Sequence, residues 1–138
     1  MMIHLATAVC ICTGAVSVHA HHSYGMFFDL CTRVTIEGHV ENVQWKNPHV
    51  WIDLKTDEGT AYRVEWTSLQ NLAAAGVVAG ALKAGDRVVV TGSPPRDPAL
   101  LPDPAVKVVS ALTQIRRGSD GWSWGRAPGP TPPECARK

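Results

Sequence analysis

The sequence predicts a mainly β protein, a small barrel of five strands with one helix between the third and fourth strands. Three observations lead to this prediction. Apolar and polar residues alternate with the period of two that strands have, in five separate stretches of the chain. One stretch, around residues 69–75, has the pattern of a short helix. The first alternating stretch is long and changes its apolar parity once, which is typical of a strand that bends.

The first strand is expected over residues 33–45. Its apolar face begins with Val34 and Ile36 and has shifted by one residue when it reaches Val43. A single inserted residue near Glu41-Asn42 accounts for the shift, so we predict a β-bulge there. A strand that bends in this way can pair with two different neighbours along its length, and such a strand suits a small closed barrel.

The second and third strands form a predicted hairpin. Strand two is expected over residues 49–55 and strand three over residues 60–67, and the residues Asp-Glu-Gly at 57–59 form the turn. A further turn, Lys-Asn-Pro at 46–48, separates strand two from strand one. Apolar residues occupy one face of both strands, whereas the other face carries polar and charged residues together with Trp51.

The helix and the last two strands complete the prediction. Ser68 is a favourable N-cap for the helix, and Gly76 is a favourable stop. Strand four is expected over residues 87–92 and strand five from residue 105 to about residue 115, with a proline-rich loop at 93–104 between them.

Three strands, a helix and two strands, with a coiled first strand, is the order of the oligonucleotide/oligosaccharide-binding (OB) barrel. In that fold the helix covers one end of the barrel. The alternative is a small open β-sandwich in which residues 69–75 are a loop. The parity change in strand one and the position of the single helix favour the barrel.

The first residues have the features of a secretory signal peptide. Residues 3–18 contain no Asp, Glu, Lys or Arg, and the run is shorter than the roughly 20 apolar residues of a transmembrane helix. Small residues stand at positions −3 and −1 if cleavage follows Ala20. We therefore expect a signal peptide at 1–20, an OB-like barrel domain at 21–117 and a Pro/Gly-rich tail at 118–138. The mature protein is expected to be exported, periplasmic or secreted, without a membrane span.

The charge balance and the cysteines limit the possible partners. A formal net charge of +1 lacks the basic surplus of a nucleic-acid-binding surface, so no nucleic-acid partner is expected. After cleavage two of the four cysteines remain, Cys31 and Cys135, and they can form a disulfide in an oxidising compartment. Their spacing leaves open whether they pair. Trp122 and Trp124 in the tail either dock on the barrel or belong to an extended end.

The histidines give the most specific functional hypothesis. Cleavage after Ala20 would leave His21 as the first residue, with an α-amine and an imidazole that can chelate a divalent metal ion together. His49 would supply a further imidazole, and His22 could replace it or add a fourth ligand. Copper ranks before zinc because the affinity of nitrogen sites peaks at Cu(II). The alternative is a solvated His-His end and a His49 that only bonds a turn carbonyl.

Aromatic residues offer a second hypothesis. Trp45 and Trp51 can form a surface that binds a peptide, a glycan or a protein partner, although packing in the core and at strand edges is the usual role of such residues. The mature chain has no nucleophile elbow, phosphate-binding loop or Cys-x-x-Cys motif. We therefore expect a non-enzymatic binding module for a metal ion or small ligand. A copper redox enzyme that uses the same histidines is the remaining alternative.

Several segments together resemble a family of small exported bacterial proteins of unknown function. They are His-His-Ser-Tyr at 21–24, Trp-Lys-Asn-Pro-His at 45–49, the Gly-Asp strand at 85–92 and Pro-Pro-Arg-Asp at 94–97. The resemblance covers roughly residues 20–115. It implies an exported barrel domain and brings no established activity, and it does not include the two cysteines or the tail.

Overall fold

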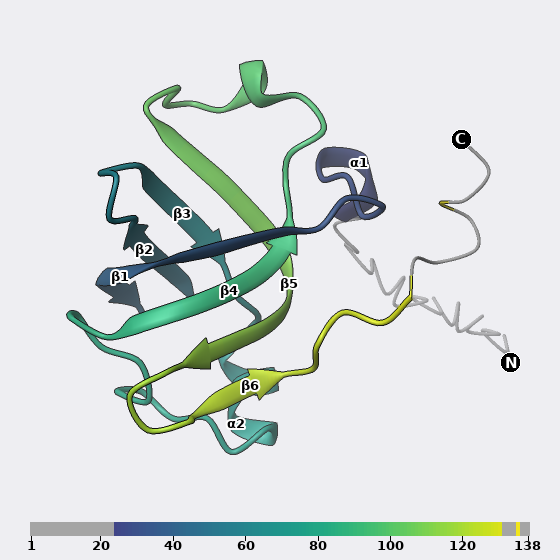
Figure 1. Ribbon diagram of the computed structural model, residues 1–138. Helices are drawn as coiled ribbons and strands as arrows, with labels where there is room; N and C mark the ends of the chain where they lie inside the picture. Colours follow the sequence, from purple (N-terminus) through teal and green to yellow (C-terminus); the bar gives the residue numbers. More distant parts are fainter. Residues whose placement is uncertain (1–23, 131–134, 136–138) are drawn as a thin grey trace, which may run out of the picture.

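The computed structural model describes residues 24–130 and Cys135, and these residues form a small β-barrel (Figure 1). The mainly β fold predicted from the sequence, with a helix between the third and fourth strands, is confirmed. In chain order the elements are α1 (Tyr24–Phe27), β1 (Val34–Gln44), β2 (Trp51–Lys55), β3 (Ala61–Glu65), α2 (Leu69–Ala74), β4 (Arg87–Ser93), the 3-10 turn η1 (Pro98–Leu100), β5 (Val106–Arg117) and β6 (Ser123–Gly125).

The barrel closes because β5 pairs with two different strands. The strand order is β3-β2-β1-β4-β5-β6, and the first part of β5, residues 106–109, pairs in parallel with β3. From residue 110 onward β5 pairs antiparallel with β4. A ring of strands that returns to β3 is an OB-like barrel, and the open sandwich considered as an alternative is excluded.

β1 has the bend that the parity change predicted. Its register with β2 shifts between Val40 and Asn42, which places the bulge at Glu41. Residues 34–39 pair with β4, whereas His39 and Val40 and the residues after the bulge pair with β2. β1 also passes close to the β2–β3 hairpin, because a Cβ on Gly38 would lie only 2.6 Å from the carbonyl oxygen of Lys55. Glycine is needed for this approach.

The helix α2 covers one end of the barrel (Figure 1). The hydroxyl of Ser68 accepts a hydrogen bond from the backbone N–H of Asn71, so Ser68 is the expected N-cap. Gly76 follows the helix with a φ of +74°, a conformation that favours glycine. Leu72 is buried and joins α2 to the core.

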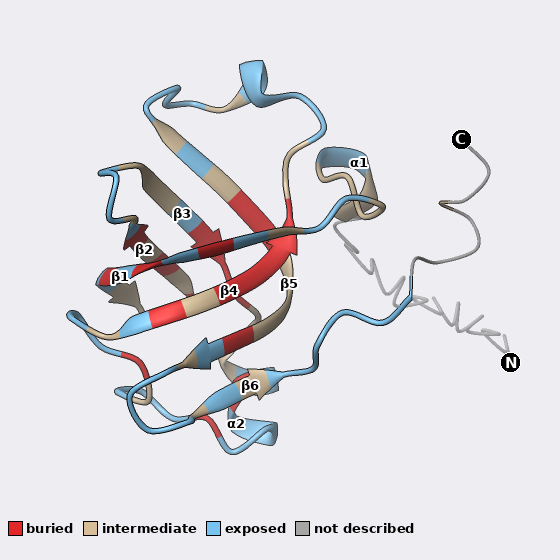
Figure 2. Ribbon diagram, in the orientation of Figure 1, coloured by how far each residue is buried: buried red, intermediate tan, exposed pale blue. Residues whose placement is uncertain are grey.

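The core is made from the apolar faces that the alternation predicted, and Figure 2 shows it as buried segments in the middle of the strands. The inward residues of β1, β2, β3, β4 and β5 are buried, while those between them are mostly exposed or intermediate. The largest fully buried side chains include Ile52, Leu54, Leu72, Leu82 and Ile115.

The start of the predicted tail belongs to the sheet. β6 pairs antiparallel with the last residues of β5, and the rings of Trp122 and Trp124 stand edge-on to Trp66 at 6.4 Å and 5.4 Å between centroids. Farther along, Cys135 is bonded to Cys31, with 5.3 Å between the two Cα atoms. Of the two possibilities for the tail tryptophans, docking on the barrel is the one that the structure has.

Candidate functional site

The candidate site lies on the outer face of the β2–β3 hairpin, beneath α1. Val50, Ile52 and Val64 point into the core, so the alternate residues of this hairpin point outward. Trp51 is paired with Glu65 across the two strands. His49 precedes β2 on the same face. In OB barrels this face and the adjoining loops are where ligands bind.

A buried carboxylate connects His49 to β5. One oxygen of Glu65 is hydrogen-bonded to Nδ1 of His49, and the other accepts a hydrogen bond of 2.5 Å from the hydroxyl of Ser110. Glu65 is only 8% exposed and Ser110 is fully buried. Because a carboxylate accepts and does not donate, Nδ1 of His49 carries the shared proton. Nε2 of a neutral His49 then keeps its lone pair.

The ring of Tyr24 stacks on the ring of His49. Their centroids are 6.1 Å apart and the planes are inclined by 24°. Burial of Tyr24 raises the pKa of its phenol, and the nearby charge of Glu65 raises it further. Tyr24 therefore stays neutral over the ordinary pH range and covers one side of the imidazole, while about a quarter of the His49 side chain is exposed.

Two cavities flank this group of residues. One, of about 280 Å³, is lined by Tyr24 and His49, and the other, of about 360 Å³, extends along the loop between β4 and β5 as far as Leu101. Trp51 and Glu65 line both cavities, together with the aromatic residues Phe27 and Phe28. Most of the wall is apolar. Glu65 and His49 are the ionisable groups of the first cavity beside the phenol of Tyr24, and Glu65, Arg96 and Asp97 are those of the second.

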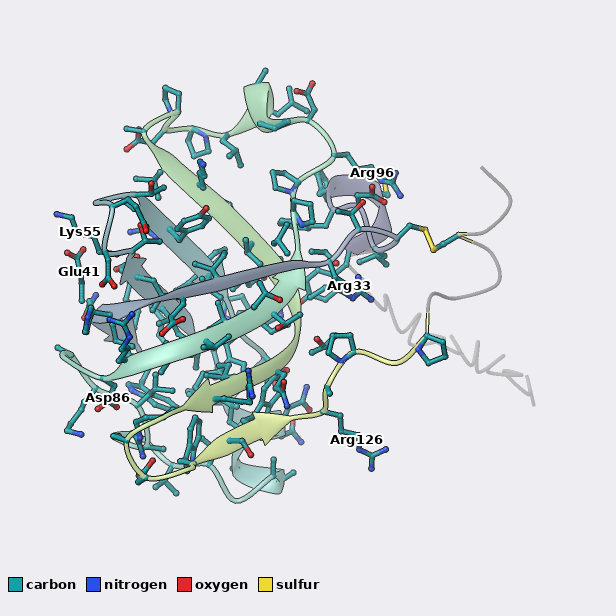
Figure 3. The ribbon with its side chains drawn as sticks, viewed as in Figure 1. Arg33, Glu41, Lys55, Asp86, Arg96 and Arg126 are labelled. Atoms are coloured by element: carbon teal, nitrogen blue, oxygen red, sulfur yellow. A yellow bond between two sulfur atoms is a disulfide. The ribbon has the colours of Figure 1, made fainter. Side chains whose placement is uncertain are left out.

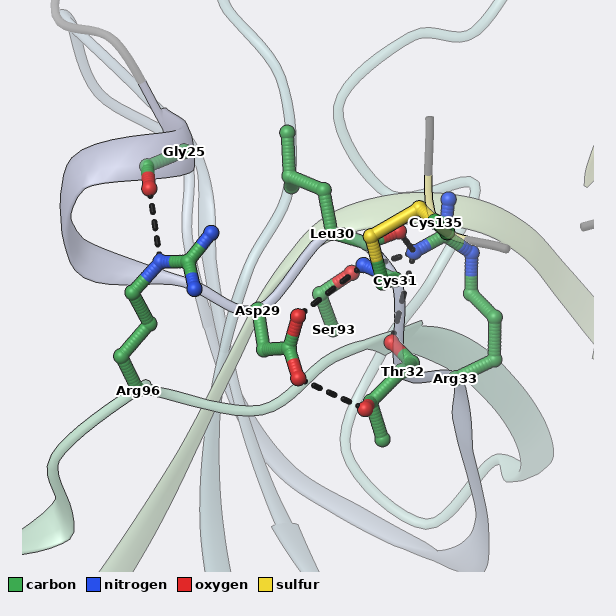
Figure 4. The surroundings of a disulfide bond; sticks show 9 residues. All are labelled: Gly25, Asp29, Leu30, Cys31, Thr32, Arg33, Ser93, Arg96 and Cys135. Atoms are coloured by element: carbon green, nitrogen blue, oxygen red, sulfur yellow. Dashed lines mark hydrogen bonds between the residues drawn. A yellow bond between two sulfur atoms is a disulfide. The ribbon is translucent and has the colours of Figure 1, made fainter. Parts of the chain in front are cut away.

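The loop between β4 and β5 holds α1 in place. Arg96 donates its backbone N–H to the carbonyl of Phe27 at 2.8 Å, and its side chain donates to the carbonyl of Gly25 at 2.7 Å (Figure 4). Figure 3 shows Arg96 and Arg33 on the side of the barrel where α1 and the disulfide lie. α1 is thus tied to the loop between β4 and β5, and just after α1 the backbone N–H of Asp29 donates to the carbonyl of Pro94 at 2.9 Å.

Farther along the same face the polar groups are already paired. Asp53 accepts hydrogen bonds from Arg63 at 2.9 Å, from Asn42 at 3.3 Å and from Gln44 at 3.4 Å. Partial burial on its own would raise the pKa of Asp53, but these hydrogen bonds and the charge of Arg63 outweigh it and lower the pKa. This cluster ties β1, β2 and β3 together on the outer face and does not include His49.

The residues predicted to form a site are distributed as follows. His49 and Trp51 line a common cavity. Trp45 packs against Trp66 with 5.8 Å between ring centroids, so it belongs to the core side of the barrel and does not share a surface with Trp51. His21 and His22 lie outside the described residues. Within residues 24–130 and Cys135, no group of three or more His, Cys, Asp or Glu side chains is placed to hold a metal ion.

Three residues of the site were missed from the sequence, namely Tyr24, Glu65 and Ser110. The position of Glu65 beside His49 could have been predicted from the hairpin turn. Once the turn is set, the register pairs residue 51 with residue 65, and Glu65 becomes a diagonal neighbour of His49 on the outer face. Nothing comparable was available for Ser110, because its approach depends on the parallel pairing of β3 with β5.

Among the residues that the structure describes, no helix has the length and apolar character needed to cross a membrane. No curated protein and no solved structure matches the chain. Residues 8–100 match the model of a family of unknown function, DUF6152, and this match covers more than half of the chain. Together with the barrel described above, it shows that the chain belongs to the family of unknown function DUF6152.

Proposed function

We propose that this protein is an exported, non-enzymatic binding module that holds a divalent metal ion, Cu(II) before Zn(II), between His49 and the histidine at its mature N-terminus. The observation that carries the proposal is the stacking of Tyr24 on the ring of His49. His21 stands three positions before Tyr24, and three extended residues span about 10 Å. The amine and imidazole of His21 can therefore reach the exposed side of His49.

The hydrogen bond between His49 and Glu65 supports a ligand role for His49. Metal-binding histidines commonly donate their second ring N–H to a carboxylate, which fixes the tautomer and the ring orientation. Here the carboxylate of Glu65 is itself held by the hydroxyl of Ser110. Nε2 of His49 is then the free donor. In this proposal Glu65 is a positioning residue, which acts on the metal only through His49.

The anchoring of the N-terminal arm supports the same proposal. A ligand set that is held in place before the ion arrives loses less conformational freedom on binding, and its affinity is higher for that reason. The hydrogen bonds from Arg96 hold α1, and with it Tyr24, against the loop between β4 and β5, and we infer that the residues just before Tyr24 start from a fixed point beside His49. The disulfide supports export, because structural disulfides persist in oxidising compartments.

The donor set favours copper. An α-amine and imidazoles are nitrogen donors of intermediate softness, and for such donors the affinity of divalent ions rises to a maximum at Cu(II) and is lower for Zn(II). His22 is available as an additional imidazole. The metal would be the bound ligand of the module, and the residues described at the site serve to hold and orient its donors.

The test uses protein that a cell has exported and processed, with its first residue established by intact mass. Cu(II) is titrated by calorimetry into the parent, into His49→Ala and into His21→Ala, and we expect both variants to lose affinity strongly. His39→Ala is the matched control, because His39 is an exposed strand residue near Arg87 and Asp57. Parent-like binding by His49→Ala, or a mature chain that does not begin at His21, would contradict the proposal.

Glu65→Gln tests the positioning role separately. It keeps the shape of the side chain and removes the charge that orients His49, so the affinity for Cu(II) should fall by about 10–100-fold. The Cu(II) electron paramagnetic resonance spectrum should change as well, since the imidazole is no longer held in one orientation. An unchanged spectrum and affinity would show that Glu65 serves the fold alone.

A second candidate function is the binding of a peptide or protein partner with apolar side chains. It is favoured by two large apolar residues of α1, Met26 and Phe27, which are 72% and 61% exposed beside the cavity that contains Trp51. Partner binding becomes the better-supported function if Cu(II) binding is the same in the parent and in both histidine variants. Phe27→Ser should then weaken partner binding without affecting the barrel.

A further inference from the structure

A separate cavity lies at the end of the barrel opposite to α2. Its volume is about 430 Å³, within the range of roughly 300–1,000 Å³ that small-molecule pockets have. It lies between the start of β1, the start of β5 and the loop that carries η1, and its wall is mostly apolar. The apolar lining includes the strand residues Val34, Ile36 and Val109 and the loop residues Pro94, Pro98 and Leu101.

The polar groups of this cavity are Thr35, which is hydrogen-bonded to Thr91, and the pair Lys107 and Tyr62. Lys107 has the same parity in β5 as the buried Val109 but is itself exposed, so it stands where this row of residues leaves the core and the barrel opens. It is paired with Tyr62 of β3, and its Nζ lies 5.6 Å from the centroid of the Tyr62 ring. Lys107 therefore places a positive charge at the rim of this mostly apolar cavity.

The ammonium group of Lys107 lies over the ring of Tyr62, and among the described residues neither the ammonium group nor the Tyr62 hydroxyl has a polar side-chain partner. In the described part of the chain, Lys107 has no acidic partner and the hydroxyl of Tyr62 has no hydrogen-bond partner. The lysines and arginines elsewhere on the barrel that bridge to carboxylates, such as Arg63 and Arg87, differ in this respect. A single free cation beside a phenolic donor is complementary to one carboxylate.

We propose that this open end of the barrel binds a small carboxylic acid with an apolar body, of the medium-chain fatty acid class. The alkyl chain would lie against Val34, Ile36 and Val109, and the carboxylate would bond Lys107 and the hydroxyl of Tyr62. Small polar anions should bind weakly, because they have no apolar part to bury against the wall. Uncharged alkyl chains should also bind less well, because they cannot pair with the charge of Lys107. This site is distinct from the one at His49, which lies on the outer face of the β2–β3 hairpin, and it stands independently of the metal proposal.

Decanoate is the probe for the test, and decan-1-ol and acetate are its matched controls. In ¹H–¹⁵N spectra of the folded protein, decanoate should shift the amide signals of Val34, Tyr62 and Val109, whereas acetate should not. Lys107→Gln should weaken decanoate binding by about tenfold, the size of one charge-assisted hydrogen bond at a partly exposed rim, and should leave decan-1-ol binding unchanged.

Lys46→Gln is the control variant, because it removes one exposed positive charge from the turn before β2 and does not line this cavity. It should bind decanoate as the parent does. The proposal is overturned if decanoate shifts signals around Trp51 in place of those at the open end. It is also overturned if Lys107→Gln and Lys46→Gln bind decanoate equally well, or if no binding is seen at millimolar decanoate.

Discussion

The two ends of the barrel are built in opposite ways. At the end covered by α2, Trp122 and Trp124 stand edge-on to Trp66, and the buried Leu72 fills the space below the helix. At the other end the inward-facing row of β5 finishes in Lys107, beside a cavity of about 430 Å³. Both ends have the same alternation of inward and outward residues. The alternation therefore determines which side chains point into the barrel. Whether those side chains become part of the core depends on whether a helix or other side chains cover that end of the barrel.

The outer face shows the same contrast on a smaller scale. Asp53 and its three hydrogen-bond donors form a closed polar cluster, whereas His49 has one nitrogen bonded to Glu65 and a partly exposed side chain that lines a cavity. Saturated groups contribute to stability, and groups with a free donor or lone pair remain available for a ligand. Substitutions in the packed regions should therefore change stability most, and substitutions in the open regions should change ligand binding most.

The largest effect is expected at the packed end. Trp66 is 2% exposed and contacts three other tryptophans, so Trp66→Ala should lower the free energy of unfolding by about 3–5 kcal/mol. Tyr62→Ala at the open end should cost much less, because that ring already borders a cavity. Urea unfolding followed by fluorescence measures both. Equal losses would contradict the contrast between the two ends.

Loss of the disulfide between Cys31 and Cys135 is expected to have the second-largest effect on stability. The bond joins residues 104 positions apart, so its removal releases a very long loop in the unfolded chain. The double variant Cys31→Ser and Cys135→Ser should lose about 2–4 kcal/mol of unfolding free energy, and a reducing agent should have the same effect on the parent. If the reduced parent keeps the stability of the oxidised protein, the two chain segments are held together by other contacts.

A smaller effect is expected in the polar network beneath α1. Ser110→Ala removes the hydrogen bond to one oxygen of Glu65 and should cost about 1.5–3 kcal/mol, the range for a bond to a charged group. Ser123→Ala in β6 is the matched control, since Ser123 is exposed and should have no measurable effect. A stable Ser110→Ala protein with weaker Cu(II) binding would show that the network serves the ligand more than the fold.

The smallest effect concerns acid stability at the β5–β6 turn. Hydrogen bonds from Arg117 and from the backbone N–H of Trp122 lower the pKa of the exposed Asp120 to about 2. An unfolded Asp has a pKa of about 3.9, so the stabilisation is complete above that pH and is lost as the pH falls toward 2. The urea midpoint of the parent should decrease over this range, and Asp120→Asn should reduce the decrease. Glu58→Gln, in an exposed turn, should not.

Much of the fold could be predicted from local sequence. The parity change around Glu41 predicted the bulge, and Ser68 and Gly76 predicted the ends of α2. The alternation in strands two and three predicted which residues face the core. These features depend only on neighbouring residues, on their backbone preferences and on the period of two. All of that information is present in the sequence.

The candidate site was predictable only in part. His49 and Trp51 were chosen from their residue types and their place in the hairpin, and they do share a cavity. Glu65 was not chosen, although the hairpin register alone places it beside His49. Ser110 could not be chosen, because its contact with Glu65 exists only once β3 and β5 pair in parallel. For Trp45 the sequence left open a ligand surface and packing in the core, and its contact with Trp66 is of the second kind.

The sequence by itself therefore determined the strands, the turns, the capped helix and the candidate cysteine pair. Tertiary structure decided that Tyr24 covers His49, that Trp122 and Trp124 pack on Trp66, and that Lys107 stands beside an open cavity. The physical reason is the separation along the chain. Local patterns act over a few residues, but each of these contacts joins segments more than 20 positions apart, and they meet only after the barrel has closed.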